Sequence, residues 1–235
     1  MSTVFSLLLN SCVSNIDRSA FSAQLTYAVV TFGLTPEVLL IDEVSVDIKP
    51  LQQARSRMLA TKPVASRMAT EFIEGFVQNA PMKIIYGRRV TDKKQYQTLS
   101  TAATPGKNQY IAVGDYYNYT HEESAQSREL ASVLNVDGVI MIYSSLEASG
   151  TAVLLPNKEL GGTYKPAIHS HIVAYNKNGK RVINRRIRYK SAKRIKPSKS
   201  GVHYLELRRT LAGYDARLAG ITAARKLWGG LSVKK

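Results

Sequence analysis

The chain has 235 residues and a formal net charge of +16, with 44% hydrophobic and 21% charged residues. This composition excludes disorder along the whole chain, because a globular core can form without cross-links. A single cysteine excludes an internal disulfide framework and a cysteine-rich zinc site.

The first feature along the chain is an apolar run that starts at Val4 and leads to the only cysteine. Leu9, Ser11 and Cys12 resemble the end of a bacterial lipoprotein signal, where a leucine and a small residue precede the lipidated cysteine. The resemblance implies that residues 1–11 are removed and that Cys12 carries acyl chains such as palmitate, which hold the protein on a membrane.

Two departures from that pattern keep a second interpretation open. Asn10 is unusual in this motif, and no Lys or Arg precedes Arg18, although a signal peptide has a basic start. The second interpretation is a short buried strand or helix in which Cys12 packs as a small apolar group. No other stretch approaches about 20 apolar residues, so we expect no membrane-spanning helix.

The sequence of the first half of the domain predicts strands and one amphipathic helix. The segments bounded by Gly33, Pro36 and Pro50 are typical of strands, and apolar residues three and four apart predict a helix that begins near Pro63. In chain order we expect strands at 27–32 and 38–48, a helix at 63–79, a strand at 83–90 and a helix-poor connection at 91–107.

The second half predicts a helix, a buried strand and a hairpin. Thr120 and Glu123 form a capping box before a helix at 121–134, and the apolar run Val136–Tyr143 predicts a strand covered on both faces. The dipeptide Asn178-Gly179 predicts a hairpin turn between strands at 168–175 and 181–189.

On the return strand of this hairpin, alternation separates the side chains into two faces. It places Arg185 with the apolar residues Ile183, Ile187 and Tyr189, and Val182 and Asn184 with Arg186 and Arg188. After a basic connection at 191–201, a last helix from Leu207 is expected to bury the stripe Leu211, Tyr214, Leu218 and Ile221, with Leu227 and Trp228 closing it.

These elements predict an α/β (α+β) fold, a mixed sheet flanked by helices, with a C-terminal β-hairpin and a basic amphipathic helix. We expect three parts: a signal remnant and tether at 1–26, the α/β domain at 27–200, and the C-terminal helix at 201–235 packing on the domain.

Two segments resemble a group of periplasmic lipoprotein domains with an anticodon-binding-domain-like α/β fold. They are the helix-to-strand passage Glu129–Ile140 and the hairpin Val173–Val182. The group includes the amino-terminal domain of TolB and the lipoprotein activators of penicillin-binding proteins. The resemblance implies an envelope binding module, while the 91–107 insertion and the basic tail depart from it.

Few residues suggest chemistry. His169 and His171 lie two apart on a predicted strand, so both rings point to one face and could share a metal, or could simply be exposed histidines. The cluster Tyr110, Tyr116, Tyr117 and Tyr119 could be a contact patch or could pack on the sheet. No phosphate loop or nucleophile motif is present, so we expect no enzyme, cofactor or metal.

Positive charge is concentrated at the end of the chain. Residues 1–159 hold 14 Lys and Arg against 15 Asp and Glu, whereas residues 160–235 hold 19 against 2. Such a field attracts polyanions. We expect a lipid-anchored, periplasm-facing or outer-membrane protein whose basic surface binds anionic lipid, envelope glycan or an acidic envelope protein. The candidate binding residues are Lys180, Arg181, Arg185, Arg186, Arg188, Lys190, Lys193 and Arg194.

The alternative is a cytoplasmic nucleic-acid-binding protein that uses the basic hairpin and the C-terminal helix. In that case the same cations contact phosphates, while Tyr175, Tyr189 or Tyr204 stacks on bases.

Overall fold

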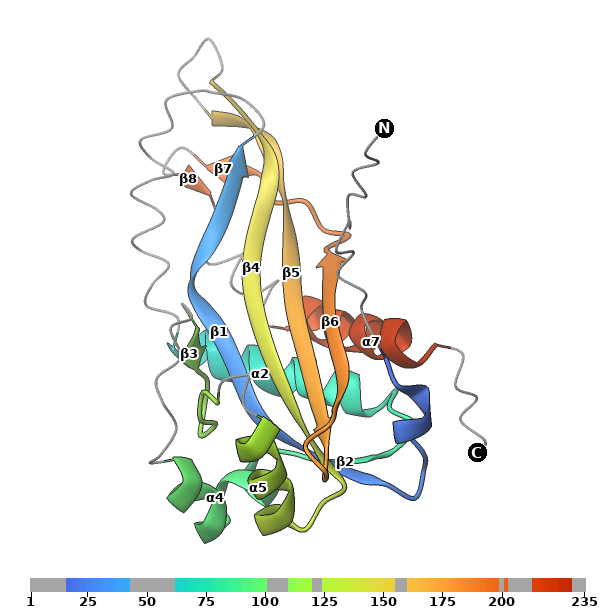
Figure 1. The fold of residues 1–235 in the computed structure, drawn as a ribbon. Coiled ribbons are helices and arrows are strands. Elements are labelled where there is room, and N and C mark those ends of the chain that lie inside the picture. Colours follow the sequence, from blue (N-terminus) through green and yellow to red (C-terminus); the bar gives the residue numbers. More distant parts are fainter. Residues whose placement is uncertain are drawn as a thin grey trace, which may run out of the picture.

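A mixed six-stranded sheet forms the centre of the computed structural model, which describes residues 16–42, 62–100, 110–119, 124–154, 160–198, 201–202 and 213–229. The strand order is β2-β1-β4-β5-β6, with β3 on the same edge of β1 as β2 (Figure 1). β2, β1 and β4 are parallel, and β5 and β6 are antiparallel to their neighbours. The strands are β1 (Thr26–Asp42), β2 (Lys83–Ile85), β3 (Ile111–Ala112), β4 (Gly138–Leu154), β5 (Leu160–Asn176) and β6 (Arg181–Lys190).

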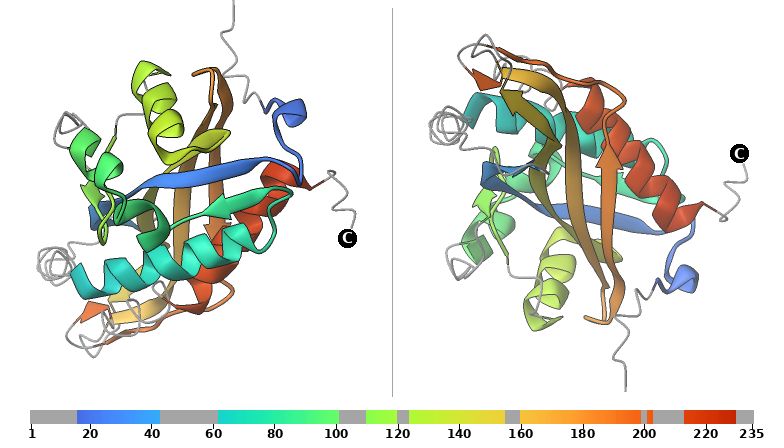
Figure 2. Two further views of the ribbon diagram at one scale, coloured as in Figure 1. Left: turned by 90° about the horizontal axis from the view of Figure 1, so that it is seen from below. Right: turned by 90° about the horizontal axis from the view of Figure 1, so that it is seen from above.

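Helices cover both faces of this sheet, which confirms the predicted fold class. One face carries α2 (Lys62–Val77) and α7 (Tyr214–Trp228), and the other carries α3 (Arg88–Thr91), α4 (Lys94–Ser100) and α5 (Ser124–Leu134) (Figure 2). The remaining elements are short: the 3-10 turn η1 (Arg18–Ala20) and the strands β7 (Pro197–Ser198) and β8 (Gly201–Val202).

The two faces of β4 belong to two separate apolar cores. Ile140 and Ile142 pack with the α2–α7 layer, whereas Val139 and Met141 pack with the α5 layer. All four side chains are fully buried, which confirms the prediction of a strand covered on both faces. The helix at 63–79 and the hairpin are also confirmed, and the 121–134 helix is present from Ser124. The capping box lies outside the described residues.

The predictions for β1 and for the region after β2 were partly wrong. The two strands expected at 27–32 and 38–48 form one strand as far as Asp42, and residues 43–48 lie outside the described residues. Gly33 keeps its pairing with Tyr143, and a register irregularity between Leu34 and Val38 carries the strand past Pro36. The strand expected at 83–90 ends at Ile85. The connection expected at 91–107 contains α4, which is held by the buried Tyr96.

The predicted inner stripe of the last helix was wrong in the described part, Tyr214–Trp228, while Leu207 and Leu211 lie outside the described residues. Tyr214 is 74% exposed, whereas the small residues Ala216, Gly220 and Ala223 are buried. The reason is a close approach to α2: a Cβ atom on Gly220 would lie 2.0 Å from the carbonyl oxygen of Phe72. Only small side chains fit such a contact. The expected burial of Leu227 and Trp228 is confirmed.

Candidate anion-binding site

Strand β6 presents different cations to the two faces of the sheet. Arg186 and Arg188 share the α5 face with His169 and His171, their partners on β5, whereas Arg185 pairs with Ile172 on the α7 face. This confirms the predicted split, with one correction: Val182 is buried in the α7-side core beside Ile183. The physical reason is a β-bulge: Ala174 pairs with Ile183 and Tyr175 with Arg181, so Val182 has no partner on β5 and the alternation of faces is broken there.

The open part of the α5 face carries three rows of side chains across β4, β5 and β6. We call it the three-row face. Its rows are Tyr143, His171 and Arg186; Ser145, His169 and Arg188; and Glu147, Ala167 and Lys190.

A buried carboxylate organises the second row. Glu147 is only 5% exposed; it forms an ion pair with the Nη2 atom of Arg188, and its other carboxylate oxygen contacts the Nε2 atom of His169. Its own row neighbour, Ala167, has no side chain beyond Cβ, so the Glu147 side chain can lean toward the second row. The carboxylate therefore fixes the positions of one imidazole and one guanidinium group.

A cavity of about 420 Å³ lies over the first two rows. Imidazole and guanidinium groups are prominent in its lining, which consists of Tyr110, Ser145, His169, Ser170, His171, Arg186, Ile187 and Arg188. The Nε2 atom of His171 is 2.7 Å from the Oδ1 atom of Asn184. The prediction that both histidines share one face is confirmed. Within the described ranges, no group of three or more His, Cys, Asp or Glu is placed to hold a metal ion.

The other candidate cations differ in their surroundings. Lys180 pairs with Asp17 at 2.8 Å, and Lys177 pairs with Asp137 at 3.7 Å. Arg185 is half-buried, and Lys193 is exposed. A further group is exposed and forms no ion pair with any residue that the structure describes: Arg181, Arg186, Lys190, Arg194 and Lys196.

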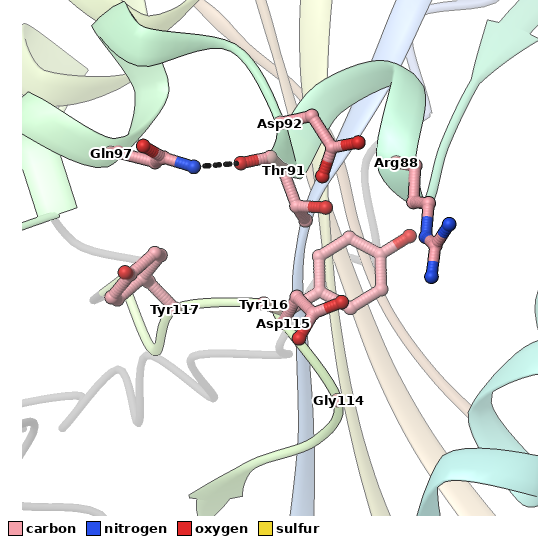
Figure 3. Close-up of a pocket in the computed structure, with 8 residues that line it drawn as sticks. All are labelled: Arg88, Thr91, Asp92, Gln97, Gly114, Asp115, Tyr116 and Tyr117. Atoms are coloured by element: carbon pink, nitrogen blue, oxygen red, sulfur yellow. Dashed lines mark hydrogen bonds between the residues drawn. The ribbon is translucent and has the colours of Figure 1, made fainter.

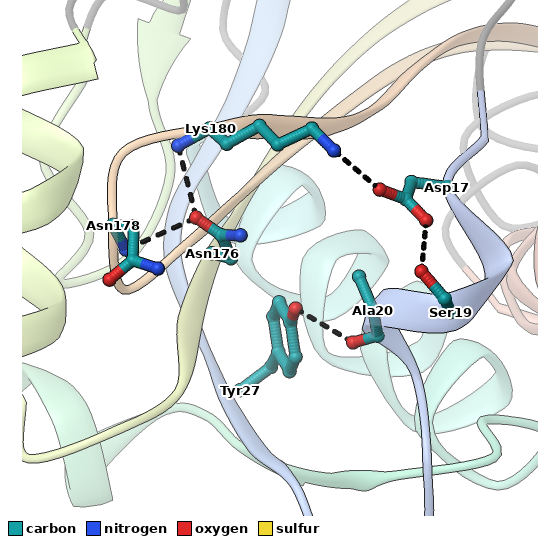
Figure 4. Close-up of polar contacts among 7 residues, drawn as sticks. All are labelled: Asp17, Ser19, Ala20, Tyr27, Asn176, Asn178 and Lys180. Atoms are coloured by element: carbon teal, nitrogen blue, oxygen red, sulfur yellow. Dashed lines mark hydrogen bonds and ion pairs between the residues drawn. The ribbon is translucent and has the colours of Figure 1, made fainter.

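The hairpin turn beside this surface is fixed by local bonds (Figure 4). The Oδ1 atom of Asn176 accepts hydrogen bonds from the backbone N–H groups of Asn178 and Lys180, at 3.1 and 3.0 Å. Gly179 has φ +77°, a left-handed conformation that glycine adopts without strain. The backbone geometry of Gly179 therefore explains why the Asn178-Gly179 dipeptide forms the predicted hairpin turn.

The chain before β1 packs against this hairpin (Figure 4). Ile16 forms an antiparallel bridge with Ile183, and the backbone N–H of Asp17 donates to the Val182 carbonyl at 3.0 Å. Hydrogen bonding from Lys180 holds the pKa of Asp17 below its ordinary value. The Tyr27 hydroxyl donates to the Ala20 carbonyl at 3.0 Å, and burial raises its pKa to about 12. The described part of the expected tether thus contacts the domain from Ile16 onward.

The tyrosine cluster mainly serves packing. Tyr116 and Tyr119 are buried, while Tyr117 is 38% exposed at a second cavity of about 530 Å³ (Figure 3). The backbone N–H of Gly87 donates to the Tyr116 hydroxyl at 2.7 Å, and burial raises the pKa of Tyr116 to about 12. Asp92, Asp115 and Arg88 stand around this cavity (Figure 3), which gives it mixed charge.

Two of the tyrosines expected to stack on nucleic-acid bases are instead buried or hydrogen-bonded within the domain. Tyr175 is 3% exposed, and the hydroxyl of the half-buried Tyr189 donates to Asp215 at 3.1 Å. Tyr204 and Cys12 lie outside the described residues. In the described part of the chain, no helix is both long enough and apolar enough to cross a bilayer.

Comparison with known proteins gives no family for this chain. No family model matches it, and no curated protein matches it. Among solved structures, it is similar to the LpoB C-terminal domain from Salmonella enterica, at 12% identity and a TM-score of 0.29, over 75% of this chain and 88% of that one. It is also similar to the hypothetical protein CT253 from Chlamydia trachomatis, at 14% identity and a TM-score of 0.28, over 86% and 99%.

Proposed function

We propose that this protein is a non-catalytic binding or assembly module of the bacterial cell envelope that docks on an anionic partner. The partner is anionic lipid, envelope glycan or an acidic envelope protein. The docking residues are Lys180, Arg181, Arg185, Arg186, Arg188, Lys190, Lys193 and Arg194.

One observation carries this proposal. β6 is the last strand in the sheet order, and it and the connection after it hold exposed cations that form no ion pair within the described ranges, among them Arg181, Lys190 and Arg194. The charge of a cation without a carboxylate partner is not neutralised locally, so it attracts an approaching polyanion more strongly. Lys180 and Arg188, which do have acidic partners, contribute less to that field.

The docking test compares two triple variants with the same loss of charge. Arg181→Ser, Lys190→Ser and Arg194→Ser together remove three cations from the proposed surface, whereas Arg67→Ser, Lys83→Ser and Arg89→Ser remove three exposed cations elsewhere. Each near-surface cation contributes about 1 kcal/mol to binding an anionic membrane, so the first variant should bind vesicles of phosphatidylglycerol roughly a hundredfold more weakly. Equal losses in both variants would refute a dedicated surface.

The envelope part of the proposal depends on the pattern Leu9-Asn10-Ser11-Cys12. Intact-mass analysis of the protein from its own cells tests it. We expect a mature chain that starts at Cys12 with the added mass of acyl chains. An unmodified chain that still carries residues 1–11 would refute the prediction that Cys12 is lipidated.

A further inference from the structure

We propose that the cavity on the three-row face binds a terminal phosphate group. This inference deepens the proposed function, on which it rests, by naming the chemical group that the basic surface recognises. The group could belong to a lipid headgroup or to free phosphate, and both offer the same tetrahedral anion.

The spacing of the four nitrogen-bearing side chains suits such an anion. Arg186 and Arg188 are two residues apart on β6, so their Cα atoms lie about 7 Å apart along the strand. His171 and His169 stand directly opposite them on β5, at about 5 Å between Cα atoms. The two arginines therefore form one side of a small rectangle and the two histidines the other, and a tetrahedral anion over it can accept hydrogen bonds from both guanidinium groups.

Three of the four groups are also held in place before any ligand arrives, since His171 contacts Asn184 while His169 and Arg188 contact Glu147. Glu147 pairs with one nitrogen of Arg188, which leaves the remaining N–H groups of that guanidinium to reach the cavity. Arg186 forms no ion pair with a described residue and lines the same cavity with Ser145. Side chains that are already positioned lose less entropy when they bind.

Charge and geometry together favour a phosphate monoester. Arg186 and Arg188 carry two positive charges against the single carboxylate of Glu147, and Lys190 adds a third in the neighbouring row of the three-row face. A monoester carries up to two negative charges, and guanidinium groups bind phosphate oxygens through paired N–H donors. A phosphodiester carries one charge and is shielded by two ester groups, so it should bind this cavity less well.

The primary experiment follows the imidazole signals of His169 and His171 by NMR while inorganic phosphate is added. Chloride at matched ionic strength is the comparison. We expect saturable shifts with phosphate and none with chloride. Arg186→Gln should weaken phosphate binding about tenfold, the loss of one charge-assisted contact, whereas Arg225→Gln, an exposed cation of α7, should leave it unchanged.

A second arm separates the two sources of the phosphate group. Vesicles with phosphatidic acid are compared with vesicles of phosphatidylglycerol at equal surface charge. A preference for phosphatidic acid that Arg186→Gln abolishes assigns the site to a lipid headgroup, whereas phosphate binding without that preference assigns it to a free phosphate group.

The inference is overturned if phosphate gives no saturable shift, or if the Arg186 and Arg225 variants respond alike. In that case, vesicle binding that still requires Arg181, Lys190 and Arg194 would leave the proposed function standing. Conversely, the protein could bind phosphate while substitution of those three residues leaves its vesicle binding unchanged. That result would refute the docking surface and would leave the phosphate site standing.

Discussion

Glu147 is the residue on which the three-row face depends. Its carboxylate is buried while both of its partners are partly exposed, with side chains 38% exposed for His169 and 39% for Arg188. A buried carboxylate is stable only when it is paired and hydrogen-bonded. Its role could not be read from the sequence, because Arg188 lies 41 residues away and the contact depends on the register of three strands.

Replacing this carboxylate tests its structural role. Glu147→Gln removes the charge and leaves Arg188 and His169 with a neutral partner, so we expect a loss of about 1–2 kcal/mol in the free energy of unfolding, after allowance for the exposure of both partners. Urea denaturation measures it. Glu129→Gln, an exposed position of α5, should leave the midpoint unchanged; equal midpoints for both variants would contradict the prediction.

Asp17 makes a pH-dependent contact at the hairpin turn. Because bonding to Lys180 lowers the pKa of Asp17 in the folded state, the contact adds stability above the ordinary pKa of 3.8 and loses it as the pH falls through the lower, folded value. Asp17→Asn should therefore melt below the native protein at pH 7, and the difference should vanish in acid. A difference in melting temperature that persists at pH 2 would contradict this sign.

At the scale of elements, the close contact between α2 and α7 depends on the absence of side chains. Gly220 faces Phe72, and a Cβ atom on Gly75 would lie 2.3 Å from the carbonyl oxygen of Arg217. Arg217 also reaches Glu71 and Glu74 at 3.6 and 3.5 Å. The two helices thus approach through glycines, and the pairing is reinforced by charges at the edge.

This contact reverses the usual effect of a glycine replacement. In an exposed helix Gly→Ala stabilises by roughly 0.5–1 kcal/mol, but Gly220→Ala should destabilise by about 1–3 kcal/mol because the new methyl group overpacks against Phe72. Thermal melting monitored by circular dichroism measures the change. Thr222→Ala on the same helix is the control and should be nearly neutral; a stabilised Gly220 variant would mean that α7 does not approach α2 so closely.

Elements with a strong local signal were predictable, and those decided by packing were not. The apolar run of β4 and the Asn-Gly turn specify their own conformations, so both were predicted. The buried face of α7 was missed because its contact residues are alanines and glycines, which add nothing to an apolar stripe. α4 was missed because its segment is polar and is held mainly by Tyr96, whose hydroxyl donates to the Val30 carbonyl at 2.7 Å.

At the scale of the whole molecule, one sheet separates two cores. Trp228 and Phe76 belong to the α2–α7 side, with ring centroids 4.8 Å apart, while Leu130 and Tyr96 belong to the α5 side. Because β1, β4 and β5 supply side chains to both cores, neither side can unfold without exposing the other. The sequence predicted the layers but could not predict that β1 runs unbroken between them.

Shared strands predict a single cooperative transition. Leu130→Ala, on the α5 side, should cost about 2–5 kcal/mol and should lower the unfolding midpoint seen by the fluorescence of the only tryptophan, Trp228, on the opposite side. The midpoint from circular dichroism should move equally. Ser132→Ala, exposed on the same helix, is the control. A tryptophan transition that does not move would show two independently unfolding parts.

The packing of residues 16–21 against β6 and α7 would also set the orientation of a molecule anchored at Cys12. Ile16 bridges β6 and the Phe21 ring lies 6.1 Å from that of Trp228, so Cys12 is only four residues from a fixed corner. Four extended residues reach about 14 Å. An acyl anchor at Cys12 would therefore keep Ile16 and the neighbouring hairpin close to the bilayer surface. Lys177, Lys180 and Arg181 would then face the headgroups, and the opposite tip of the sheet, at Leu154 and Leu160, would project outward (Figure 1).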